Sequence, residues 1–422
     1  MNPLKIAHLN YRCEGISLYD VIIVGAGPAG SIAARRCASL GLNVIIVEKE
    51  RIPRTKTCAG AVSTKALNLI GTKIPSSLIE RNIRGLRFFS PNLHSVSYIS
   101  NKLLGISTMR DKFDAFLTKL AVDEGCELID SDPVTDIHIS IDKAVCRLQS
   151  GRSIQGQMVI GADGANGITA KKTNIRNKWK KDQVGLCLET SFRLDKEKLE
   201  EMIDPEIYES YFIGIPLGYA WLLPKKTSVS IGIGAFLTYL KHTRSILVNF
   251  CDTISKLKKI NIKISQFRAH LAPAGGFSRN HVSNRVLLVG DAAGFIDPLT
   301  GEGIYYSMKS GLVAADACEK AIEENRFSNS YLTQHYSSLC RKTFEEDLGI
   351  ALSLTYKIHD NFDLFFELMR IYSCSSSAAL ARGEINYRIL RRKILSQMPK
   401  TLLSFLIGTT TQKLRSNTND NK

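Results

Sequence analysis

The sequence predicts an α/β fold in which a parallel, doubly wound sheet is combined with an antiparallel second sheet and a helical C-terminal region. Residues 19–48 have the pattern of strand, glycine turn, helix and strand. Residues 185–234 alternate apolar and polar side chains, as antiparallel strands do. From about residue 327 onward the apolar residues have helical spacing.

Composition sets the first limits on function. The 422 residues can form two or three domains, and contents of 44% hydrophobic and 23% charged residues are ordinary for a globular protein. The formal net charge of +16 is not ordinary. The sequence contains no nucleic-acid-binding module, so we expect contact with an anionic membrane surface and no nucleic-acid partner. The alternative is a solvated, lysine-rich surface.

Cysteine usage and the N-terminus indicate the compartment. Ten cysteines without a C-x-x-C pair predict no metal site and no secreted disulfide scaffold. The first 18 residues lack the apolar core of a signal peptide, and no window approaches the ~20 apolar residues of a spanning helix. We therefore expect a cytoplasmic protein that can lie peripherally on the inner face of the membrane. Whether Cys318 and Cys340 form a pair is left open.

The first strand, turn and helix have the residue types of a dinucleotide-binding unit. An apolar run at 21–24 leads into Gly25-Ala26-Gly27-Pro28-Ala29-Gly30 and a helical segment to Leu40. Gly25 makes the tight turn, Gly27 allows a pyrophosphate to approach the backbone, and Gly30 packs the helix against the strand. The helix then presents free N–H groups to the anion.

The second strand of this unit, residues 44–47, ends in an acid. Glu48 lies 18 residues beyond Gly30, where a carboxylate can accept hydrogen bonds from both ribose hydroxyls. A carboxylate at this point argues against a phosphorylated ribose. These residues alone therefore leave FAD and NAD as candidates.

The following elements are expected in chain order. Small residues flank Cys58, so the backbone there can approach a ligand, although a packed thiol is the alternative. A short helix over 63–69, capped by Ser63 or Thr64, precedes strands within 84–100. We then expect a helix from Met109 that closes at Gly125, a third strand of the nucleotide-binding domain over 127–134 and a hairpin over 137–154.

Two further buried strands end in glycine turns that contain an aspartate. The first leads into Gly161-Ala162-Asp163-Gly164, and the second into Gly290-Asp291-Ala292. The loop 297–303 then opens a long helix to about Glu324, and its N-terminus can stabilise negative charge opposite it. Between these blocks, 171–181 reads as a basic linker, and Tyr219 and Trp221 share one face of a strand.

The C-terminal part carries an apolar and basic segment. Residues 389–407 interleave leucine and isoleucine with arginine and lysine, and the chain from residue 385 onward has eight basic residues and one acidic residue. We expect this segment to rest on anionic lipid. The alternative is an ordinary helix that covers the core and ends in a tail from Thr409.

Four separated blocks together resemble the para-hydroxybenzoate hydroxylase-type flavoproteins, and this resemblance favours FAD over NAD. They are the glycine turn with Glu48, Arg110-x-x-Phe113-Asp114, Gly161-Ala162-Asp163-Gly164, and Gly290-Asp291-Ala292 with Gly301-Glu302-Gly303-Ile304. Three segments are similar, more narrowly, to the geranylgeranyl reductase family. They are Lys56-Thr57-Cys58-Ala59-Gly60, Tyr219-x-Trp221-x-x-Pro224-Lys225 and Asp297-Pro298-Leu299-Thr300-Gly301-Glu302-Gly303. Many members of that family have glycine at the position of Ala59 and an aromatic residue at that of Leu223.

The resemblance, which covers roughly residues 18–325, implies the site residues. Cofactor contacts are expected from Gly25, Gly27, Ala29, Gly30, Glu48, Lys49, Cys58, Ala59, Gly60, Arg110, Val134, Asp163, Gly164, Asp291, Gly301, Gly303 and Ile304. Arg110 and Asp291 would hold the central part of FAD, and Gly301, Gly303 and Ile304 would hold the pyrimidine edge of the flavin. Asp163 and Gly164 would shape the turn rather than take part in the chemistry.

The same resemblance implies a reductase that saturates C=C bonds of isoprenoid chains with hydride from reduced flavin. Cys58 is the catalytic candidate, and Tyr219 and Trp221 would line the lipid pocket. The alternatives are an FAD-dependent monooxygenase or halogenase of the same fold, or electron relay to a membrane quinone.

The electron donor is left undetermined between NAD(P)H and a small carrier such as ferredoxin. No second glycine fingerprint is evident, because Gly232-Ile233-Gly234 falls at a predicted strand end without a following helix. For the domains we expect a discontinuous FAD-binding domain of 1–75, 101–175 and 280–325. An antiparallel-sheet substrate domain of 76–100 and 176–279 and a helical region of 326–422 would complete the chain.

Overall fold

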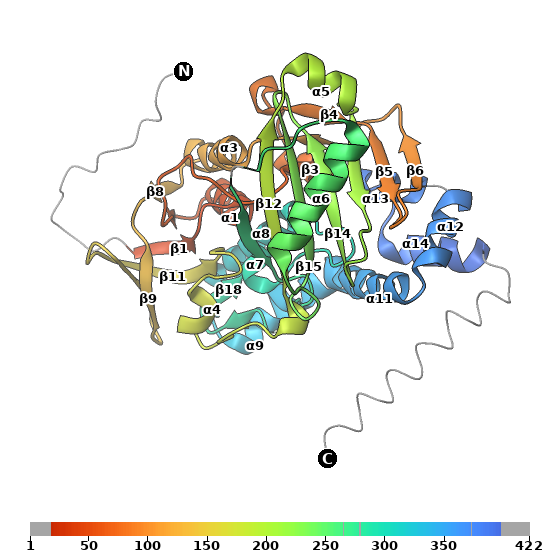
Figure 1. Ribbon diagram of the computed structural model, residues 1–422. Coiled ribbons are helices and arrows are strands. Elements are labelled where there is room, and N and C mark those ends of the chain that lie inside the picture. The colour runs from red at the N-terminus through yellow and green to blue at the C-terminus, as the bar shows by residue number, and fades with distance from the viewer. Residues whose placement is uncertain (1–17, 265, 278–279, 373, 398–422) are drawn as a thin grey trace.

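The structure, a computed structural model, describes residues 18–264, 266–277, 280–372 and 374–397. Two large sheets, a small third sheet and a helical C-terminal region make up the molecule (Figure 1). The predicted α/β class with an antiparallel second sheet is confirmed. The predicted tail from Thr409, and the part of the 389–407 segment beyond residue 397, lie outside the described residues.

The first sheet has eight strands, in the order β17-β18-β11-β1-β2-β8, with β10 and β9 added beside β11. The strands are β1 (Leu18–Val24), β2 (Val44–Val47), β8 (Glu127–Ile129), β9 (Val134–Ile139), β10 (Ala144–Leu148), β11 (Ser153–Gly161), β17 (Val282–Ser283) and β18 (Val286–Leu288). The pairings from β18 through β11, β1 and β2 to β8 are parallel. With helix α1 (Pro28–Ser39) between β1 and β2, the predicted strand–turn–helix–strand unit is confirmed.

Successive side chains of β1 point to opposite faces of this sheet, and both faces are covered. Val21 and Ile23 pack into the cluster that contains α1, α3 (Arg110–Asp123) and α8 (Ile304–Glu323). Ile22 and Val24 point the other way, into a cluster formed with β9 and β10. Helices therefore cover one face and a β-ribbon covers the other, so that β1 is buried on both sides.

Two predicted details are wrong. The predicted strand 127–134 ends early, because Ser131 has a φ of 61° and Pro133 has no N–H for the ladder. Gly232 and Gly234 lie inside a strand rather than at its end. A Cβ atom at Gly232 would lie 2.2 Å from the Trp221 ring, so this glycine makes room for an aromatic side chain.

The second sheet has seven strands, in the order β16-β12-β15-β14-β13-β5-β6. They are β5 (Gly85–Phe89), β6 (Ser95–Ile99), β12 (Gly185–Arg193), β13 (Ile207–Tyr211), β14 (Gly218–Pro224), β15 (Ser228–Phe236) and β16 (Arg268–Ala272). All pairings are antiparallel except that of β13 with β5. Helix α6 (Thr243–Lys258) covers one face, where Phe250 and Ile254 pack with Ile231 and Ile233.

The remaining elements before the C-terminal region are short. They are β3 (Ala61–Ser63), β4 (Arg81–Ile83) and β7 (Gly105–Ser107), which form the third sheet, the helices α2 (Thr64–Ile70), α4 (Thr169–Lys172), α5 (Lys196–Met202) and α7 (Gly290–Ala293), and the 3-10 turns Ser76–Leu78 and Lys181–Gln183. Helix α2 begins as predicted, because the Ser63 hydroxyl accepts the N–H of Ala66 at 3.3 Å.

The C-terminal region is helical as far as it is described, as predicted. It contains α9 (Asn329–Leu332), α10 (Ser338–Cys340), α11 (Glu346–Asp360), α12 (Phe362–Tyr372), α13 (Ser375–Arg382) and α14 (Tyr387–Gln397), with π-helical turns at Thr333–Ser337 and Arg341–Glu345. Helices α12 and α14 both contact α11. Cys318 and Cys340 are buried free thiols. Within the described segments, no helix has the length and apolar character needed to cross a bilayer.

Candidate functional site

A cavity of about 1350 Å³ connects the two large sheets with the C-terminal helices. Its wall includes the turn between β1 and α1, the start of α8, the face of the second sheet opposite α6, and parts of α12 and α14. Pockets for single drug-sized ligands typically measure about 300–1000 Å³. The cavity is therefore large enough for an extended cofactor together with a second ligand.

The start of α1 forms an anion cradle in this wall. Gly27 is the N-cap of α1 and no side chain caps it, so the first-turn N–H groups are left for a ligand. Gly25 has a φ of 105°, and a Cβ atom there would lie 2.5 Å from the carbonyl oxygen of Ala162. Gly30 does not line the cavity, but a Cβ atom on it would lie 1.9 Å from the Gly25 oxygen. These residues fit a pyrophosphate.

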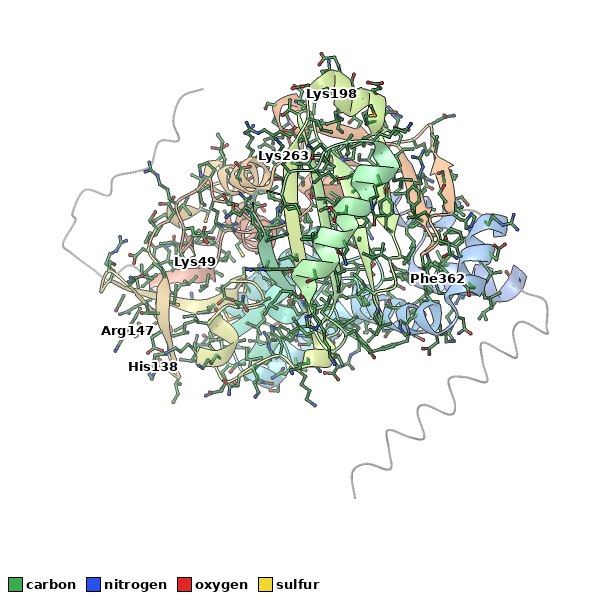
Figure 2. The ribbon with its side chains drawn as sticks, in the orientation of Figure 1. Lys49, His138, Arg147, Lys198, Lys263 and Phe362 are labelled. Carbon is green, nitrogen blue, oxygen red and sulfur yellow. The ribbon has the colours of Figure 1, made fainter. Side chains whose placement is uncertain are left out.

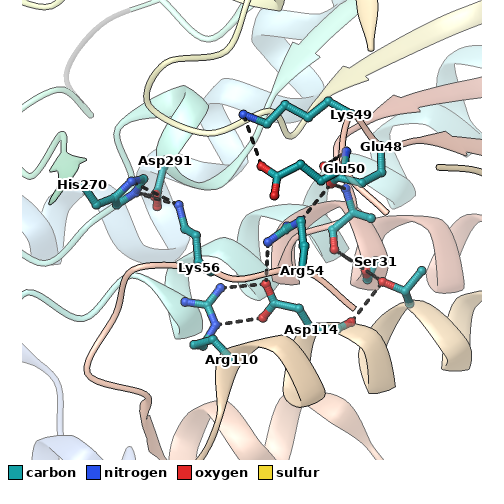
Figure 3. A network of polar contacts seen from close by, with 12 residues as sticks. Ser31, Glu48, Lys49, Glu50, Arg54, Lys56, Arg110, Asp114, His270 and Asp291 are labelled. Atoms are coloured by element: carbon teal, nitrogen blue, oxygen red, sulfur yellow. Dashed lines mark hydrogen bonds and ion pairs between the residues drawn. The ribbon is translucent and has the colours of Figure 1, made fainter. Parts of the chain in front are cut away.

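Glu48 lies at the end of β2, with 3% of its surface exposed, and lines the same cavity. Its Oε2 atom accepts the N–H of Ala26 at 2.8 Å and lies 3.3 Å from Nε of Arg54. Arg54 also approaches Oδ2 of Asp114 at 3.4 Å, and Arg110 holds Asp114 through two bonds of 2.8 and 3.0 Å (Figure 3). Sequence reasoning did not identify Arg54 as part of this chain of charges.

Arg110 lines the cavity and carries a permanent positive charge. Burial lowers its pKa, but the charge of Asp114 and the hydrogen bonds to it outweigh burial and hold the pKa above its usual range. A fixed guanidinium suits the central, phosphate-bearing part of a dinucleotide.

A second polar cluster joins the two large sheets. Asp291 lies in the first turn of α7, and its Oδ2 atom is 3.2 Å from Nε2 of His270 on β16. Nζ of Lys56 lies 2.8 Å from the same ring nitrogen (Figure 3). Burial raises the pKa of Asp291, but the His270 contact and the Lys56 charge outweigh it and keep the pKa below its usual value. The roles of Lys56 and His270 were not predicted.

The loop before α8 is fixed by one buried carboxylate. Asp297 is 1% exposed, and its Oδ1 atom accepts the N–H groups of Leu299 at 2.9 Å and Thr300 at 3.1 Å. Its Oδ2 atom accepts the hydroxyl of Tyr387 at 2.6 Å. The hydroxyl of Tyr219 also donates to the carbonyl of Thr300. The loop is therefore held from the second sheet and from the C-terminal region.

The start of α8 completes the wall at this point. Gly303 is its N-cap and no side chain caps it, which leaves first-turn N–H groups from Ile304 onward for a ligand. The N–H of Gly301 instead donates to the carbonyl oxygen of Asp297 at 2.9 Å. Glu302 also lines the cavity, where it forms an ion pair with Lys65 at 2.7 Å and accepts the Ser63 hydroxyl. Gly301, Gly303 and Ile304 all line the cavity here, and their contact with the pyrimidine edge of a flavin stays a prediction.

Cys58 lines the cavity from the loop that follows β2. Its backbone N–H donates to Oε2 of Glu189 at 3.0 Å. Gly60 lies behind the cavity wall with a φ of 84°, and a Cβ atom there would lie 2.2 Å from the carbonyl oxygen of Thr108. Glycine is therefore needed at position 60 for the turn that presents Cys58.

Glu189 links Cys58 to the aromatic side of the cavity. Its Oε1 atom accepts the hydroxyl of Ser230 at 2.7 Å, and Ser230 in turn accepts the indole N–H of Trp221 at 3.2 Å. Burial raises the pKa of Glu189, against the opposing effects of the Ser230 hydrogen bond and the Lys225 charge. Neither Glu189 nor Ser230 was predicted.

Tyr219 and Trp221 both line the cavity from β14, so the prediction that they share a face is confirmed. Their ring centroids are 6.5 Å apart in an edge-to-face arrangement. Beyond them the wall is mainly apolar, and it includes Leu223, Phe212, Phe362, Phe365, Leu368 and Met369.

The other predicted cofactor residues also reach this wall. Ala29, Lys49, Ala59, Val134, Asp163, Gly164 and Asp291 line it, so that Gly30 and Gly60 are the predicted residues that do not. Asp163 is turned inward and accepts the N–H and the hydroxyl of Thr169, both at 2.8 Å, as a turn-shaping residue would. Lys49 lies at the rim, with its side chain 67% exposed.

Two family models match the chain. An FAD binding domain matches residues 20–68, and the tryptophan halogenase model matches residues 76–372. The first match covers the strand–turn–helix–strand unit and Cys58. FAD is therefore the cofactor of this chain, and its contacts with the glycine cradle, Glu48 and Arg110 stay a prediction.

Curated relatives and solved structures agree with these matches. The chain is 30% identical to the digeranylgeranylglycerophospholipid reductase of Methanosarcina acetivorans, over 79% of this chain and 83% of that protein. It is 28% identical to the enzyme of the same name from Methanococcus vannielii, over 92% and 97%. A geranylgeranyl bacteriochlorophyll reductase-like protein from Thermoplasma acidophilum superposes with a TM-score of 0.79 at 25% identity, over 91% and 100%. The flavin-dependent brominase Bmp2, at 18% identity and a TM-score of 0.70, shares the fold.

Proposed function

Because the chain belongs to the geranylgeranyl reductase family of FAD-dependent oxidoreductases, we propose that it saturates C=C bonds of isoprenoid chains on a lipid. The observation that carries this proposal is the continuity of the cavity. The same cavity is lined by the FAD cradle at Gly25 and Gly27, by Cys58, and by an apolar stretch that starts at Tyr219 and Trp221. A long hydrocarbon chain fits such a slot.

FAD in its reduced form supplies the hydride when it is bound. The residues of the chain position the cofactor and exclude water. Arg110 and the uncapped starts of α1 and α8 offer positive charge and N–H groups to its negatively charged parts. Trp221 and Leu223, which are 6% and 0% exposed, keep the reaction space dry.

Reduction of an unconjugated alkene also needs a proton on the second carbon. Cys58 is the first candidate for this role, because it is a free, half-buried thiol that lines the same cavity as the FAD cradle and the aromatic pair. The hydrogen bond from its N–H to Glu189 fixes the backbone that carries the thiol. We therefore propose that Cys58 delivers the proton.

Mass spectrometry tests the proposed function directly. Chemically pre-reduced, FAD-loaded protein is incubated anaerobically with a digeranylgeranyl phospholipid. We expect products that are heavier by two hydrogens for each bond saturated. The control is that the bound flavin is reduced and can be reoxidised by a nonspecific acceptor. If the lipid is unchanged in such a preparation, the proposed function is refuted.

A monooxygenase or halogenase is the second candidate, because the tryptophan halogenase model covers residues 76–372. The need for molecular oxygen distinguishes the reductase from a monooxygenase or halogenase. A halogenase or monooxygenase consumes oxygen in a substrate-dependent reaction and inserts halide or an oxygen atom, whereas the reductase works under anaerobic conditions. Electron relay predicts quinone reduction without any change in the lipid chain.

We further propose that the reductant is NAD(P)H or a small electron carrier, and that the enzyme works peripherally on the anionic inner face of the membrane. The net charge of +16 and the insolubility of isoprenoid lipids support the membrane location. Stopped-flow reduction of the bound flavin by each donor distinguishes the reductants.

A further inference from the structure

We propose that the cavity opens to the surface between α12 and α14, and that this opening rests on an anionic membrane from which isoprenoid chains enter. This inference builds on the proposed function, because it assumes a lipid substrate. It adds the surface of the protein that meets the lipid and the residues that hold it there.

The cavity extends far from the FAD end of the molecule. Lys49 and Phe362 both line it, and they lie on opposite sides of the molecule in Figure 2. The first marks the FAD end, next to Glu48, and the second belongs to α12. The cavity therefore crosses the molecule from the nucleotide-binding loops to the C-terminal helices.

The wall at the far end is also part of the outer surface. The lining residues there are Phe362, Phe365, Leu368 and Met369 from α12, and Leu390, Lys393 and Ile394 from α14. All of them are half-buried except Lys393, which is exposed. Because Lys393 both lines the cavity and is exposed, the wall reaches the outer surface here, and apolar surface beside such an opening commonly binds a partner.

The outward side of α14 indicates what that partner is. The helix, YRILRRKILSQ, has four basic residues and no acidic residue. Ile389 and Leu395 are 40% and 39% exposed on it, and Arg391 and Arg392 are also exposed. Arg388 is paired with Glu346, whereas Arg391, Arg392 and Lys393 are exposed, the last at the edge of the cavity. A helix with exposed basic and aliphatic residues side by side is suited to the interface of an anionic bilayer.

A membrane explains this surface better than an acidic protein partner does. Long isoprenoid chains are costly to transfer through water, so an opening pressed against the bilayer lets them enter directly. The exposed aliphatic residues and the apolar rim of α12 would face the acyl region, while Arg391, Arg392 and Lys393 meet the headgroups. Such an arrangement suits lipids with anionic headgroups.

Vesicle co-sedimentation tests the proposal with the full, FAD-loaded chain. Vesicles of phosphatidylcholine with about one third phosphatidylglycerol are compared with pure phosphatidylcholine. We expect wild type to bind the anionic vesicles, and the double variant Arg391→Ser/Arg392→Ser to bind them roughly ten-fold more weakly or worse. Ile389→Ser/Leu395→Ser should also weaken binding. The matched control is Lys171→Ser/Lys178→Ser, which removes two exposed basic residues elsewhere and should bind nearly as wild type does.

The outcomes separate this inference from the proposed function, because vesicle binding is measured without turnover. Equal losses in the α14 variants and the control, or no loss in any variant, would overturn the inference even if the enzyme saturates lipids in detergent. If the α14 variants lost reduction by an acidic carrier protein but bound vesicles normally, the surface would be a protein-docking site and the inference would again be wrong. The α14 variants should reduce a detergent-dispersed prenyl lipid as fast as wild type does. If wild type and all variants failed to reduce this lipid, the proposed function would be wrong, and the inference about the membrane surface would not be affected.

Discussion

The hydroxyl of Tyr387, at the start of α14, donates a 2.6 Å hydrogen bond to Oδ2 of Asp297 in the loop before α8. Both side chains are buried, at 2% and 1% exposure. Because Asp297 also accepts the N–H groups of Leu299 and Thr300, this bond couples the C-terminal region to the loop at the start of α8. The helix that would meet the membrane is thus tied to the cofactor loop.

Replacing Tyr387 with phenylalanine leaves a buried carboxylate oxygen without its donor. We expect Tyr387→Phe to reduce the free energy of unfolding by about 1–3 kcal/mol and to raise the dissociation constant for FAD several-fold. Urea unfolding and flavin fluorescence titration measure the two effects. Tyr356→Phe is the matched control, because Tyr356 is 39% exposed on α11 and should change neither quantity. Normal stability and FAD affinity in Tyr387→Phe would show that the bond does not hold the loop.

Gly30→Ala should abolish FAD binding and destabilise the fold. The new Cβ atom would lie 1.9 Å from the backbone oxygen of Gly25, so α1 and the turn must move apart. Gly349→Ala is the control, because Gly349 lies in α11 with no atom within 4 Å of the new Cβ atom. That change should raise the free energy of unfolding by roughly 0.5–1 kcal/mol. An FAD-binding Gly30→Ala protein would contradict the predicted packing.

The parts of the fold and site that the sequence predicted are encoded by neighbouring residues. The β1–α1–β2 unit, the N-cap at Ser63 and the helix start at Gly303 each depend on a short run with its own turn and capping chemistry. The early end of β8 was missed because it is set by the positive φ of Ser131, which is unusual for a serine.

Several of the missed site residues act over long separations in the chain. Cys58 contacts Glu189 across 131 residues, and Lys56 contacts His270 across 214. A glutamate or a histidine on an alternating strand has the same local pattern whether it faces solvent or a partner in another sheet. Such pairs become visible after the sheets are assembled, and a sequence pattern does not specify that assembly.

Cys58→Ser tests the proposed proton donor. With pre-reduced enzyme we expect alkene saturation in a single turnover to slow by about 100-fold or more, while FAD content stays normal. The matched control is Cys187→Ser, which alters a second thiol that lines the same cavity. Burial raises the pKa of Cys187 to about 12, so it is not expected to supply a proton at neutral pH. Full turnover in Cys58→Ser would remove Cys58 from the mechanism.

Glu189→Gln should change how stability depends on pH. Burial raises the pKa of Glu189 above its ordinary value of 4.5, despite the opposing Ser230 hydrogen bond and Lys225 charge. The folded protein therefore keeps this proton at pH values at which the unfolded chain has released it. Its contribution to stability is complete below pH 4.5 and is lost as pH rises through the raised pKa.

The glutamine variant has no titrating group at this position, so its melting temperature should fall less than that of wild type as pH rises from 4.5. Scanning calorimetry between about pH 4 and pH 8 measures the difference. The exposed Glu201 on α5 provides the control, because Glu201→Gln should keep the wild-type slope. If Glu189→Gln and wild type had parallel profiles, the pKa of Glu189 would be the same in the folded and unfolded protein, the raised pKa would be wrong, and the side chain would be ionised at neutral pH. Its hydrogen bonds from Cys58 and Ser230 would then be those of a carboxylate, which would leave it a purely positional role.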